Sequence, residues 1–552
     1  MPASLVFPVY DPLFEVPVFE DDKGICLAGE RCLLFRNDHS ILITRESSGF
    51  DAAREGLRRF AELRQAAGAY HVYQITDIAL WSAAASGMTA VEMIDLMRRY
   101  GQHSPPPSLI AHIQQIVGRY GFLRLTGSTG ALRLVSGDRA LLARLANDLR
   151  LELEPDGVVI SAEQRGVIKA RLAEIGYPVV DEAALSLSPQ VDMELKSDVR
   201  LRPYQDEAVR RFMQSGLTGG VILLPCGSGK TMIGVAAAAQ MRARTLVITP
   251  SRTIGDQWRQ HFLRLTTIEP ESVSIYRKGI APTQVMIATY QALTARNGAS
   301  SGLAEVLDHP WGLIIYDEVH SLPADVFRQS ASVQSIRRLG LTATLVREDG
   351  REREVFSLVG PTVYSTPWRD LERRGWIAPV DCIEVRIEQH GRQELTPDRA
   401  LAAKLKVLKR ILRQHTHEQT LIVAHHLKEV AAAARITGAE TITGESSLEE
   451  RETLYRNFRD GELDCLVLSR VANVGVDLPD ASVLIQISGA FGSRQEEAQR
   501  VGRVLRPKPG QSRATFYTLV TAGSREVEFA ARRQRFLIDQ GYRYRVVAAD
   551  SL

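Results

Sequence analysis

The spacing of apolar and polar residues changes character near residue 201. Beyond it, short runs rich in β-branched residues alternate with stretches of helical periodicity. Parallel strands need helical crossovers, so this alternation predicts βαβ units around a buried parallel sheet. The first set of predicted strands comprises residues 221–224, 245–249, 285–288 and 313–316. After about residue 418 the alternation returns, in residues 420–424, 465–468, 483–488 and 515–520.

The first 200 residues follow a different pattern. Residues 1–75 end in a predicted helix at about 52–66, and the pattern from 76 to about 150 is mainly helical. A strand–helix–strand pattern follows, with its helix at about 162–175. The predicted fold is α/β: two tandem parallel-sheet domains preceded by α+β domains. The predicted divisions are an N-terminal accessory region 1–150, a small domain 151–195, and parallel-sheet domains 196–365 and 366–552.

Composition adds three expectations. The 552 residues predict three or four domains, and the net charge of +3 permits a polyanionic partner without requiring one. The five cysteines are scattered without a C-x-x-C pair, which predicts reduced thiols in a cytoplasmic protein and neither a disulfide framework nor a zinc site. The first 22 residues lack the basic segment of a signal peptide, and no apolar run is long enough to predict a membrane span.

The loop of residues 224–231, LPCGSGKT, carries the first candidate chemistry. A predicted strand precedes it and a helix-forming run follows, an arrangement that binds phosphate through backbone N–H groups and the helix dipole. Lys230 would reach the outer phosphates, and Thr231 would offer its hydroxyl to Mg²⁺. Leu224 stands where the usual pattern has its first glycine, so a Gly-rich turn with a solvated lysine is the alternative. The residues of the phosphate turn are Cys226, Gly227, Ser228 and Gly229.

A second candidate follows the apolar run 312–316, which ends in Asp317, Glu318, Val319 and His320. Asp317 would hold Mg²⁺ through water, and Glu318 would orient and polarise the attacking water. A solvated acidic strand end is the alternative for a single Asp-Glu pair. It loses weight because the pair follows the phosphate loop by about ninety residues. His320 is either a functional residue or a hydrogen-bonded core histidine.

A third candidate is the stretch 495–506, QEEAQRVGRVLR. On a helix, Gln499, Arg503 and Arg506 share one face, while Arg500 lies about a quarter-turn away. Two arginines presented by a second domain fit an arginine-finger arrangement, in which their charge meets the charge on the transferred phosphoryl group. A solvated basic face is the alternative; the finger is preferred because the second parallel-sheet domain shows no other chemistry.

In order along the chain, these segments and others resemble the motifs of superfamily 2 helicases. RPYQ (202–205) resembles the adenine-reading Q-motif, LPCGSGKT motif I and DEVH (317–320) motif II. The other matches are TLVITPSRTIGDQW (245–258) to motif Ia, IATYQAL (287–293) to Ib, LTAT (341–344) to III, LIVAHH (421–426) to IV, SRVANVGVDLP (469–479) to V and QRVGRVLR (499–506) to VI. The resemblance implies that both parallel-sheet domains are RecA-like.

Within that superfamily the chain resembles the XPB-type DNA repair helicases over nearly its whole length. The triplet Arg347-Glu348-Asp349 follows motif III as the family's RED motif does, and 493–510 and 532–542 are similar to C-terminal segments of the family. Upstream, ITDIALWSAAASGM and VGRYGFLRL resemble its N-terminal region. The residues 151–195 occupy the position of the family's damage-recognition domain, although no motif there matches residue by residue.

The resemblance implies roles for individual residues. Arg202 and Gln205 would contact the adenine, with Gly475 and Asp477 of motif V also at the ATP site. Residues implied in DNA binding or in coupling it to ATP are Arg252, Thr289, His320, Thr342, Thr344, Arg347, Glu348 and Asp349. For the triplet 347–349 a charged structural turn is the alternative. Contacts to DNA phosphates give affinity without sequence readout.

The implied activity is that of an ATP-dependent 3′-to-5′ DNA helicase in nucleotide excision repair or promoter opening. ATP and Mg²⁺ would be its cofactors and a single-strand/duplex DNA junction its partner, bound without sequence preference, in the cytoplasm of a prokaryote at the nucleoid. One departure stands out. Only 77 positions separate Thr344 from Leu421, so the thumb that relatives insert there is shortened or absent.

The shortened thumb leaves two other functions open. One is a double-strand DNA translocase that never separates strands. The other is an ATP-gated scaffold that recruits a repair nuclease, which the N-terminal 190 residues, without an enzyme motif of their own, keep in play.

Overall fold

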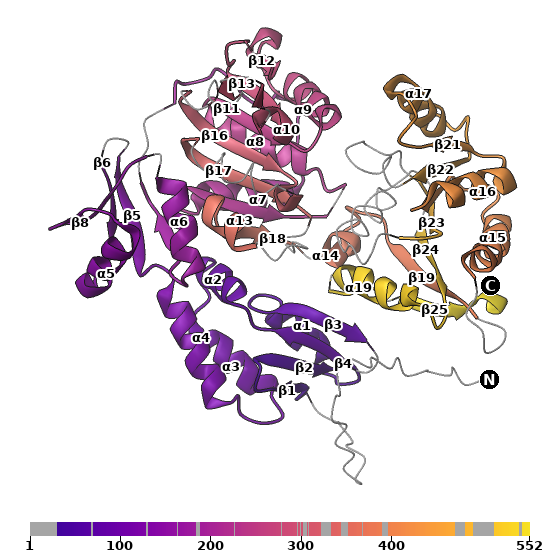
Figure 1. Cartoon of the computed structure of the whole chain (residues 1–552), viewed down its shortest axis with the longest axis horizontal. Coiled ribbons are helices and arrows are strands. Elements are labelled where there is room, and N and C mark those ends of the chain that lie inside the picture. The colour runs from indigo at the N-terminus through magenta and orange to yellow at the C-terminus, as the bar shows by residue number, and fades with distance from the viewer. Residues whose placement is uncertain are drawn as a thin grey trace. The chain divides into compact units, whose positions relative to one another are not determined.

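The computed structural model describes most of the chain, in two compact units, residues 1–121 and 122–552 (Figure 1). Each unit is considered by itself. The described residues are 30–67, 70–128, 131–162, 164–183, 188–225, 227–277, 279–294, 296–297, 300–301, 306, 309–321, 333–343, 352–366, 368–388, 396–469, 481–489, 513–539, 542 and 544–552.

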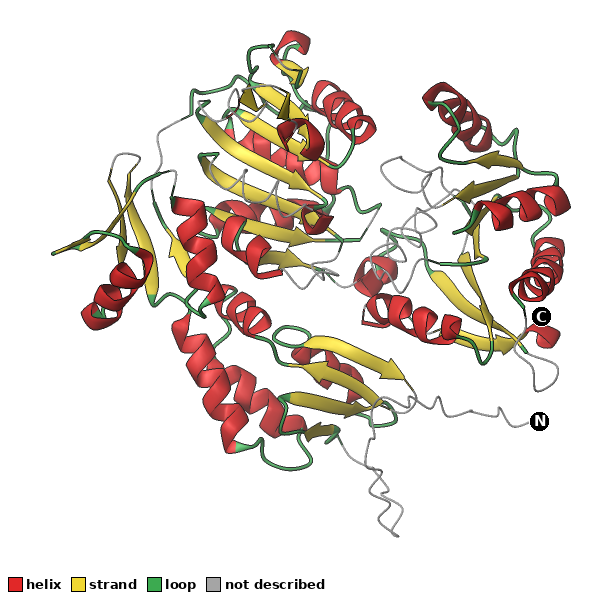
Figure 2. Ribbon diagram, in the orientation of Figure 1, coloured by secondary structure: helices red, strands yellow, loops and turns green. Residues whose placement is uncertain are grey.

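The first unit is an antiparallel sheet with four helices, in agreement with the predicted α+β character (Figure 2). The sheet has the order β1-β2-β4-β3. Its elements are β1 (Leu33–Phe35), β2 (Ser40–Thr44), α1 (Phe50–Leu57), β3 (Glu62–Ala67), β4 (Tyr70–Gln74), α2 (Asp77–Ala85), α3 (Ala90–Tyr100) and α4 (Pro107–Arg119).

The helix predicted at about 52–66 is wrong in its second half. The helix α1 ends at Leu57, and Glu62–Ala67 forms β3, which pairs with β4. The sequence of β3, ELRQAA, consists mostly of strong helix formers, so its local preference favours a helix. Pairing with a neighbouring strand overrides that preference, because strand formation depends on tertiary partners more than on composition.

The second unit begins with a five-stranded sheet of order β7-β8-β6-β5-β9, here named the accessory domain (residues 122–183). The predicted boundary at 150/151 falls inside this sheet, because β6 pairs with β8 across it, so the structure moves that boundary to about 121. The predicted strand–helix–strand at 155–190 is present as β8, α6 and β9. The elements are β5 (Leu123–Ser128), β6 (Ala131–Val135), α5 (Arg139–Leu149), β7 (Leu153–Glu154), β8 (Gly157–Ile160), α6 (Arg165–Glu174) and β9 (Val179–Asp181).

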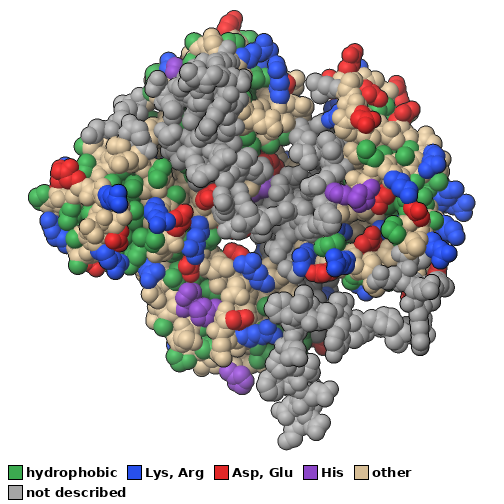
Figure 3. Space-filling view, in the orientation of Figure 1, with side chains coloured by type: hydrophobic (Ala, Val, Ile, Leu, Met, Phe, Trp, Pro, Cys, Tyr) green, Lys and Arg blue, Asp and Glu red, His purple; other side chains and the backbone are tan. Residues whose placement is uncertain are grey.

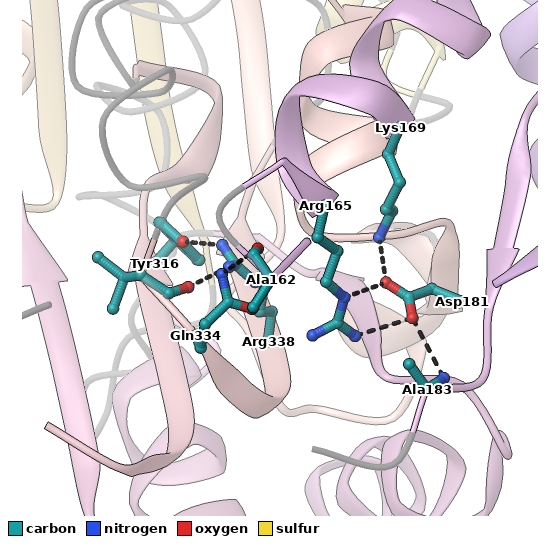
Figure 4. A network of polar contacts seen from close by, with 9 residues as sticks. Ala162, Arg165, Lys169, Asp181, Ala183, Tyr316, Gln334 and Arg338 are labelled. Carbon is teal, nitrogen blue, oxygen red and sulfur yellow. Dashed lines mark hydrogen bonds and ion pairs between the residues drawn. The ribbon is translucent and has the colours of Figure 1, made fainter. Parts of the chain in front are cut away.

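The accessory domain packs on the first parallel-sheet domain through α6, which contacts α13 (Glu352–Leu358). Gln334 Nε2 donates to the Ala162 carbonyl at 2.8 Å, next to a buried ionic cluster (Figure 4). In that cluster Asp181 accepts two hydrogen bonds of 2.8 Å from Arg165 and one of 2.9 Å from Lys169. On the sheet side, Arg338 donates to the Tyr316 hydroxyl at 2.8 Å.

The first motor domain has a seven-stranded, fully parallel sheet of order β12-β13-β11-β16-β17-β10-β18. All four strands predicted here are confirmed. The strands are β10 (Gly219–Leu223), β11 (Thr245–Thr249), β12 (Val273–Ile275), β13 (Val285–Thr289), β16 (Trp311–Asp317), β17 (Ser335–Thr342) and β18 (Thr362–Ser365). The principal helices are α7 (Pro203–Gln214), α8 (Lys230–Met241), α9 (Arg252–Leu265), α10 (Tyr290–Thr294) and α13.

The second motor domain repeats this plan with the order β21-β22-β20-β23-β24-β19-β25, again all parallel. The fold class of two tandem parallel-sheet domains is thereby confirmed. The strands are β19 (Val380–Ile387), β20 (Thr420–Ala424), β21 (Glu440–Ile442), β22 (Cys465–Ser469), β23 (Val483–Gln486), β24 (Ala514–Thr521) and β25 (Tyr544–Ala548). The helices are α14 (Trp368–Arg373), α15 (Pro397–Gln414), α16 (Leu427–Thr437), α17 (Leu448–Arg459) and α19 (Arg525–Asp539).

The interval in which relatives carry a thumb is largely occupied by these two domains. Within the described part of 344–421, α13 and β18 belong to the first motor domain, and β19 and α15 belong to the second. The short helix α14 lies between β18 and β19 in the chain. What the structure describes of this interval therefore leaves little chain for a separate thumb.

Positive charge gathers locally although the net charge is small. Lys and Arg side chains cluster over α15 in Figure 3, where Arg399, Lys406, Lys409 and Arg413 are exposed. The spacing of seven, three and four residues places them along one face of the helix. Among the described helices, none is long and apolar enough to cross a membrane, and the described cysteines Cys32, Cys382 and Cys465 are free thiols.

Candidate nucleotide-binding site

Several predicted site residues lie at the carboxyl edge of the first motor sheet. In a parallel sheet the carboxyl ends of the strands meet at one edge, where ligands usually bind. Thr342 ends β17 beside Leu223 of β10, and the Thr342 carbonyl accepts a hydrogen bond of 3.0 Å from the Leu224 amide. Asp317 ends β16 in register with Leu341 of β17. The fold thus brings the phosphate loop and the motif II carboxylates to neighbouring strand ends.

The phosphate loop needs glycine at two described positions. Gly227 and Gly229 have φ of 78° and 80°, in the left-handed region that costs other residues about 1 kcal/mol or more. A Cβ on Gly229 would lie 2.5 Å from Gln205 Nε2. Leu224 is buried and hydrogen-bonded to the neighbouring strand, so it continues the feeding strand. The absent first glycine therefore leaves the turn intact.

Lys230 is the first residue of α8 and is 9% exposed. Its ammonium lies 3.3 Å from the Leu224 carbonyl oxygen, 3.4 Å from that of Pro225 and 3.8 Å from Glu318 Oε1. The lysine thus spans the mouth of the loop and approaches the motif II carboxylate. Thr231 follows it in the first turn of α8, at the positive end of the helix dipole.

The Q-motif residues contact the phosphate loop itself. Tyr204 Oη and Gln205 Nε2 both donate to the Ser228 carbonyl, at 2.6 and 2.8 Å. Gln205 Oε1 in turn accepts a hydrogen bond of 2.9 Å from the Arg202 amide. Gln205, predicted to contact the adenine, therefore bonds the loop backbone here. The guanidinium of Arg202 lies 5.2 Å from the ring centroid of Trp376, a residue to which the sequence assigned no role.

Asp317 is buried and accepts a hydrogen bond of 2.8 Å from Trp258 Nε1. Burial, with the adjacent charge of Glu318 adding to it, raises the pKa of Asp317 to about 6. A cation bound beside this carboxylate would favour its ionised form. Trp258 lies within the segment that resembles motif Ia, but no pattern in the sequence revealed its bond to Asp317.

Glu318 adopts a φ of 50°, a left-handed conformation that is rare and strained in a residue with a long side chain. Tyr290 steadies this turn, because its hydroxyl donates to the Asp317 carbonyl and lies 3.5 Å from that of Glu318. The backbone turn aims the Glu318 carboxylate at Lys230 on one side and at His320, 3.4 Å away, on the other. Strain of this kind concentrates at functional sites.

His320 is 4% exposed, and its Nδ1 is hydrogen-bonded to the Thr342 hydroxyl. It is thus a buried, bonded histidine that also joins motif II to motif III. Contacts run from Lys230 through Glu318 and His320 to Thr342, across the ends of β10, β16 and β17. Both interpretations of His320 from the sequence remain compatible with this geometry.

Arg252 and Thr289 lie along the same edge, on the neighbouring strands. Arg252 is exposed at the start of α9, whose N-terminus is capped by Ser251. Thr289 ends β13 in register with Thr249 of β11, and its hydroxyl accepts a hydrogen bond of 3.1 Å from the Ala292 amide. The remaining predicted site residues lie outside the described residues: Cys226, Thr344, Arg347, Glu348, Asp349, Gly475, Asp477, Gln499, Arg503 and Arg506.

Three family models match the chain in succession. Residues 371–551 match the ERCC3/RAD25/XPB C-terminal helicase, and residues 198–347 match the res subunit of type III restriction enzymes. Residues 33–153 match a helicase conserved C-terminal domain, although they precede both motor domains here.

Two relatives match nearly end to end. A protein of Kineococcus radiotolerans named DNA 3′-5′ helicase XPB is 40% identical, over 94% of this chain and 97% of its own. One of Mycobacterium tuberculosis with the same name is 41% identical, over 94% and 98%. Among solved structures, an ATP-dependent Type ISP restriction-modification enzyme, LlaBIII, bound to DNA matches with a TM-score of 0.51 at 12% identity, over 64% of this chain and 31% of that one. At that identity the likeness concerns the fold alone.

Proposed function

The chain belongs to the XPB family of helicases, and from this premise we propose that it is an ATP-driven motor that acts on DNA with 3′-to-5′ polarity. The observation that carries the proposal is the meeting of the phosphate loop, Lys230 and the motif II carboxylates at one sheet edge, with 3.8 Å between Lys230 and Glu318. Positioning and charge provide most of the catalysis of phosphoryl transfer, and this edge supplies both.

In this proposal each side chain has a task. The loop amides and Lys230 bind the phosphates of ATP, and Glu318 orients the attacking water. The buried carboxylate of Asp317 and the hydroxyl of Thr231 suit the oxygen ligands that Mg²⁺ prefers. When bound, Mg²⁺ neutralises charge on the phosphates. Gln499, Arg503 and Arg506 would complete the site from the second motor domain, with Gly475 and Asp477.

Coupling to DNA follows the strand ends. Because His320 bonds Thr342, a change in the position of Glu318 can pass to motif III, which Thr344 continues. Arg252 and Thr289, at the far strands of the same edge, are proposed to bind DNA phosphates without reading sequence. The triplet Arg347-Glu348-Asp349 is proposed to act at the single-strand/duplex junction. A role in nucleotide excision repair or promoter opening is the physiological part of the proposal.

A second candidate function is translocation along duplex DNA without strand separation. The observation that favours it is the distribution of the described residues between 344 and 421, which β18, α14, β19 and α15 largely account for. A motor without a thumb has less surface with which to hold a displaced strand. The third candidate, a scaffold that recruits a repair nuclease, rests on the accessory domain and the first unit.

ATP hydrolysis measured with and without DNA tests the motor. We expect DNA to stimulate hydrolysis, and Glu318→Gln to abolish the stimulated rate while nucleotide binding persists. The matched control is Glu462→Gln, an exposed glutamate of the second motor domain, which should retain the full rate. A wild-type protein that hydrolyses no ATP with any nucleic acid would refute the motor.

A pair of substrates separates unwinding from translocation. A forked duplex with a 3′ tail reports strand separation, and a triplex reports movement along duplex DNA. Opening of the fork supports the helicase. Release of the third strand without fork opening selects the translocase, and loss of unwinding beyond loss of ATPase in a variant with alanine at 347–349 assigns the junction role to that triplet.

A further inference from the structure

Trp376 occupies a particular place between the two motor domains. It follows α14 and precedes β19, the first strand of the second motor domain, so it lies in the chain that joins the two sheets. Gly375, with φ of 69°, makes the turn after α14, and the Trp376 amide then donates to the Leu371 carbonyl at 2.9 Å. The neighbours Leu371 and Ile377 are buried. The indole is thus held by a fixed turn and is only partly buried.

Arg202 of the Q-motif meets Trp376 in two ways. Its guanidinium stacks on the indole at 5.2 Å, and its Nη1 donates to the Trp376 carbonyl at 3.1 Å. Tyr204 contacts the indole edge-to-face, with ring centroids 6.1 Å apart, and its hydroxyl lies 3.4 Å from Arg202 Nη1. A backbone bond and a cation–π contact together fix both the position and the plane of the guanidinium.

The same Q-motif turn grips the phosphate loop. Tyr204 and Gln205 both donate to the Ser228 carbonyl, and the Arg202 amide donates to Gln205. Arg202 is the N-cap residue of α7, so its backbone is fixed and only its side chain can answer a ligand. Trp376 is therefore separated from the phosphate loop by a single residue, Tyr204.

We propose that Trp376 is a positioning residue for the base of the nucleotide. It holds the Arg202 guanidinium with one face on the indole and the other face toward the base, and it thereby links base recognition to the start of the second motor domain. The proposal rests on the proposed binding of ATP at this edge. A planar guanidinium stacks on aromatic rings through either face, which gives the arrangement its chemistry.

Two substitutions separate the aromatic face from simple bulk. Trp376→Leu keeps an apolar side chain without a π-system, whereas Trp376→Phe keeps the π-face. We expect the leucine variant to raise KM for ATP about tenfold and to lower the preference for ATP over a pyrimidine triphosphate, with kcat at saturating ATP within about twofold of wild type. The phenylalanine variant should restore most of the loss. Equal KM values for wild type and the leucine variant would overturn the proposal.

A double-mutant cycle with Arg202→Gln tests the route. If Trp376 acts through Arg202, the double variant Arg202→Gln/Trp376→Leu should have the KM of Arg202→Gln alone. Additive losses would show that Trp376 acts by another path and would contradict the proposal. Full-length protein is used throughout, and its thermal unfolding verifies that each variant is folded.

Fluorescence gives a readout independent of turnover. Nucleotide without hydrolysis, in the Glu318→Gln background, should change the indole emission, and Trp376→Phe in that background should remove the change. An unaltered change after Trp376→Phe would contradict the proposal. If wild type hydrolyses no ATP, the function proposed for the site fails; if it hydrolyses ATP normally and the leucine variant has an unchanged KM, only the role of Trp376 fails.

Discussion

The two motor domains share one arrangement of strands. Counted from its own first strand, each sheet has the order third, fourth, second, fifth, sixth, first, seventh, and every pairing is parallel. Yet the first strand of one sheet, β10, leads into the phosphate loop, whereas the described chain after β19 resumes at Thr396 before the long helix α15. The scaffold is common to both, so the chemistry belongs to the loops at the strand ends.

A buried lysine in each domain shows the same difference at the level of side chains. Lys404 of α15 lies 2.7 Å from Glu526 Oε1 and donates to the Ile487 carbonyl at 2.9 Å. Lys230 has longer contacts, of 3.3 and 3.4 Å to carbonyls and 3.8 Å to Glu318. Short, saturated contacts are typical of a structural ion pair. The longer ones suit a lysine that exchanges them for phosphate oxygens.

Replacing Lys230 with methionine should have the largest effect and would break the comparison if it did not. The substitution keeps the apolar stem but removes the charge that is proposed to meet the phosphates. We expect DNA-stimulated ATP hydrolysis to fall at least about a hundredfold, as when a preorganised charge is removed from a transition state. Steady-state hydrolysis and thermal unfolding are both measured. A fall in melting temperature that accounts for the lost activity would make Lys230 structural, like Lys404.

Sequence patterns predicted the motor sheets well for a physical reason. Strands buried on both faces are continuous β-branched runs, so 245–249 and 420–424 could be read directly, and local loop chemistry identified Gly227–Lys230. The contacts that complete the site join residues far apart in sequence: Trp258 with Asp317, Tyr290 with the same turn, and Arg202 with Trp376. No periodicity encodes such pairs. For the same reason the sheet that crosses residue 150 escaped the prediction.

The first motor domain also differs by carrying the accessory domain, and Asp181→Asn should sharpen that difference. Arg165, Lys169 and Arg338 place three cations around one carboxylate, so its loss leaves buried charges unbalanced. We expect a local cost of about 3 kcal/mol. Hydrogen exchange of the α6 and β9 amides, which reports local opening, should quicken about a hundredfold. Unchanged exchange there would show that the cluster does not hold the domain.

The same carboxylate sets a pH dependence. Burial alone would raise the pKa of Asp181, but the charges of Lys169 and Arg165 outweigh it and hold that pKa well below the ordinary range. A depressed pKa stabilises the fold above the ordinary carboxyl pKa, and the contribution is lost only as the pH falls through the lowered value. Wild-type protection of α6, corrected for intrinsic exchange, should therefore be equal at pH 7 and pH 5. A loss of protection by pH 5 would contradict this ion pair.

The reciprocal substitution in the second motor domain is Lys404→Met. Removing the ammonium leaves Glu526 with its bond from the Thr521 amide, and because that carboxylate is partly exposed we expect a loss of about 2 kcal/mol in stability, less than for a fully buried pair. Hydrogen exchange in α15 measures it. ATP hydrolysis per folded molecule should stay within about twofold of wild type. A hundredfold loss of activity without loss of protection would place chemistry in the second domain at Lys404.

The smallest difference is expected between two glycines with nearly the same backbone. Gly229 has φ of 80° in the phosphate loop, and Gly438 has φ of 71° at the end of α16. Alanine costs about 1 kcal/mol at either position for conformation alone. Around Gly438 a new Cβ meets nothing within 4 Å, whereas at Gly229 it would meet Gln205 Nε2 at 2.5 Å and displace its bond to Ser228.

Both variants should therefore melt at similarly lowered temperatures, but only Gly229→Ala should raise KM for ATP, by about tenfold, the equivalent of one disrupted hydrogen bond to the loop. Thermal unfolding and ATP titration of the two proteins measure both quantities. An equal KM in the two would mean that Gln205 does not shape the loop. Since conformation is matched at the two sites, whatever difference in KM remains belongs to the surroundings of the loop, which is where the two otherwise identical scaffolds diverge.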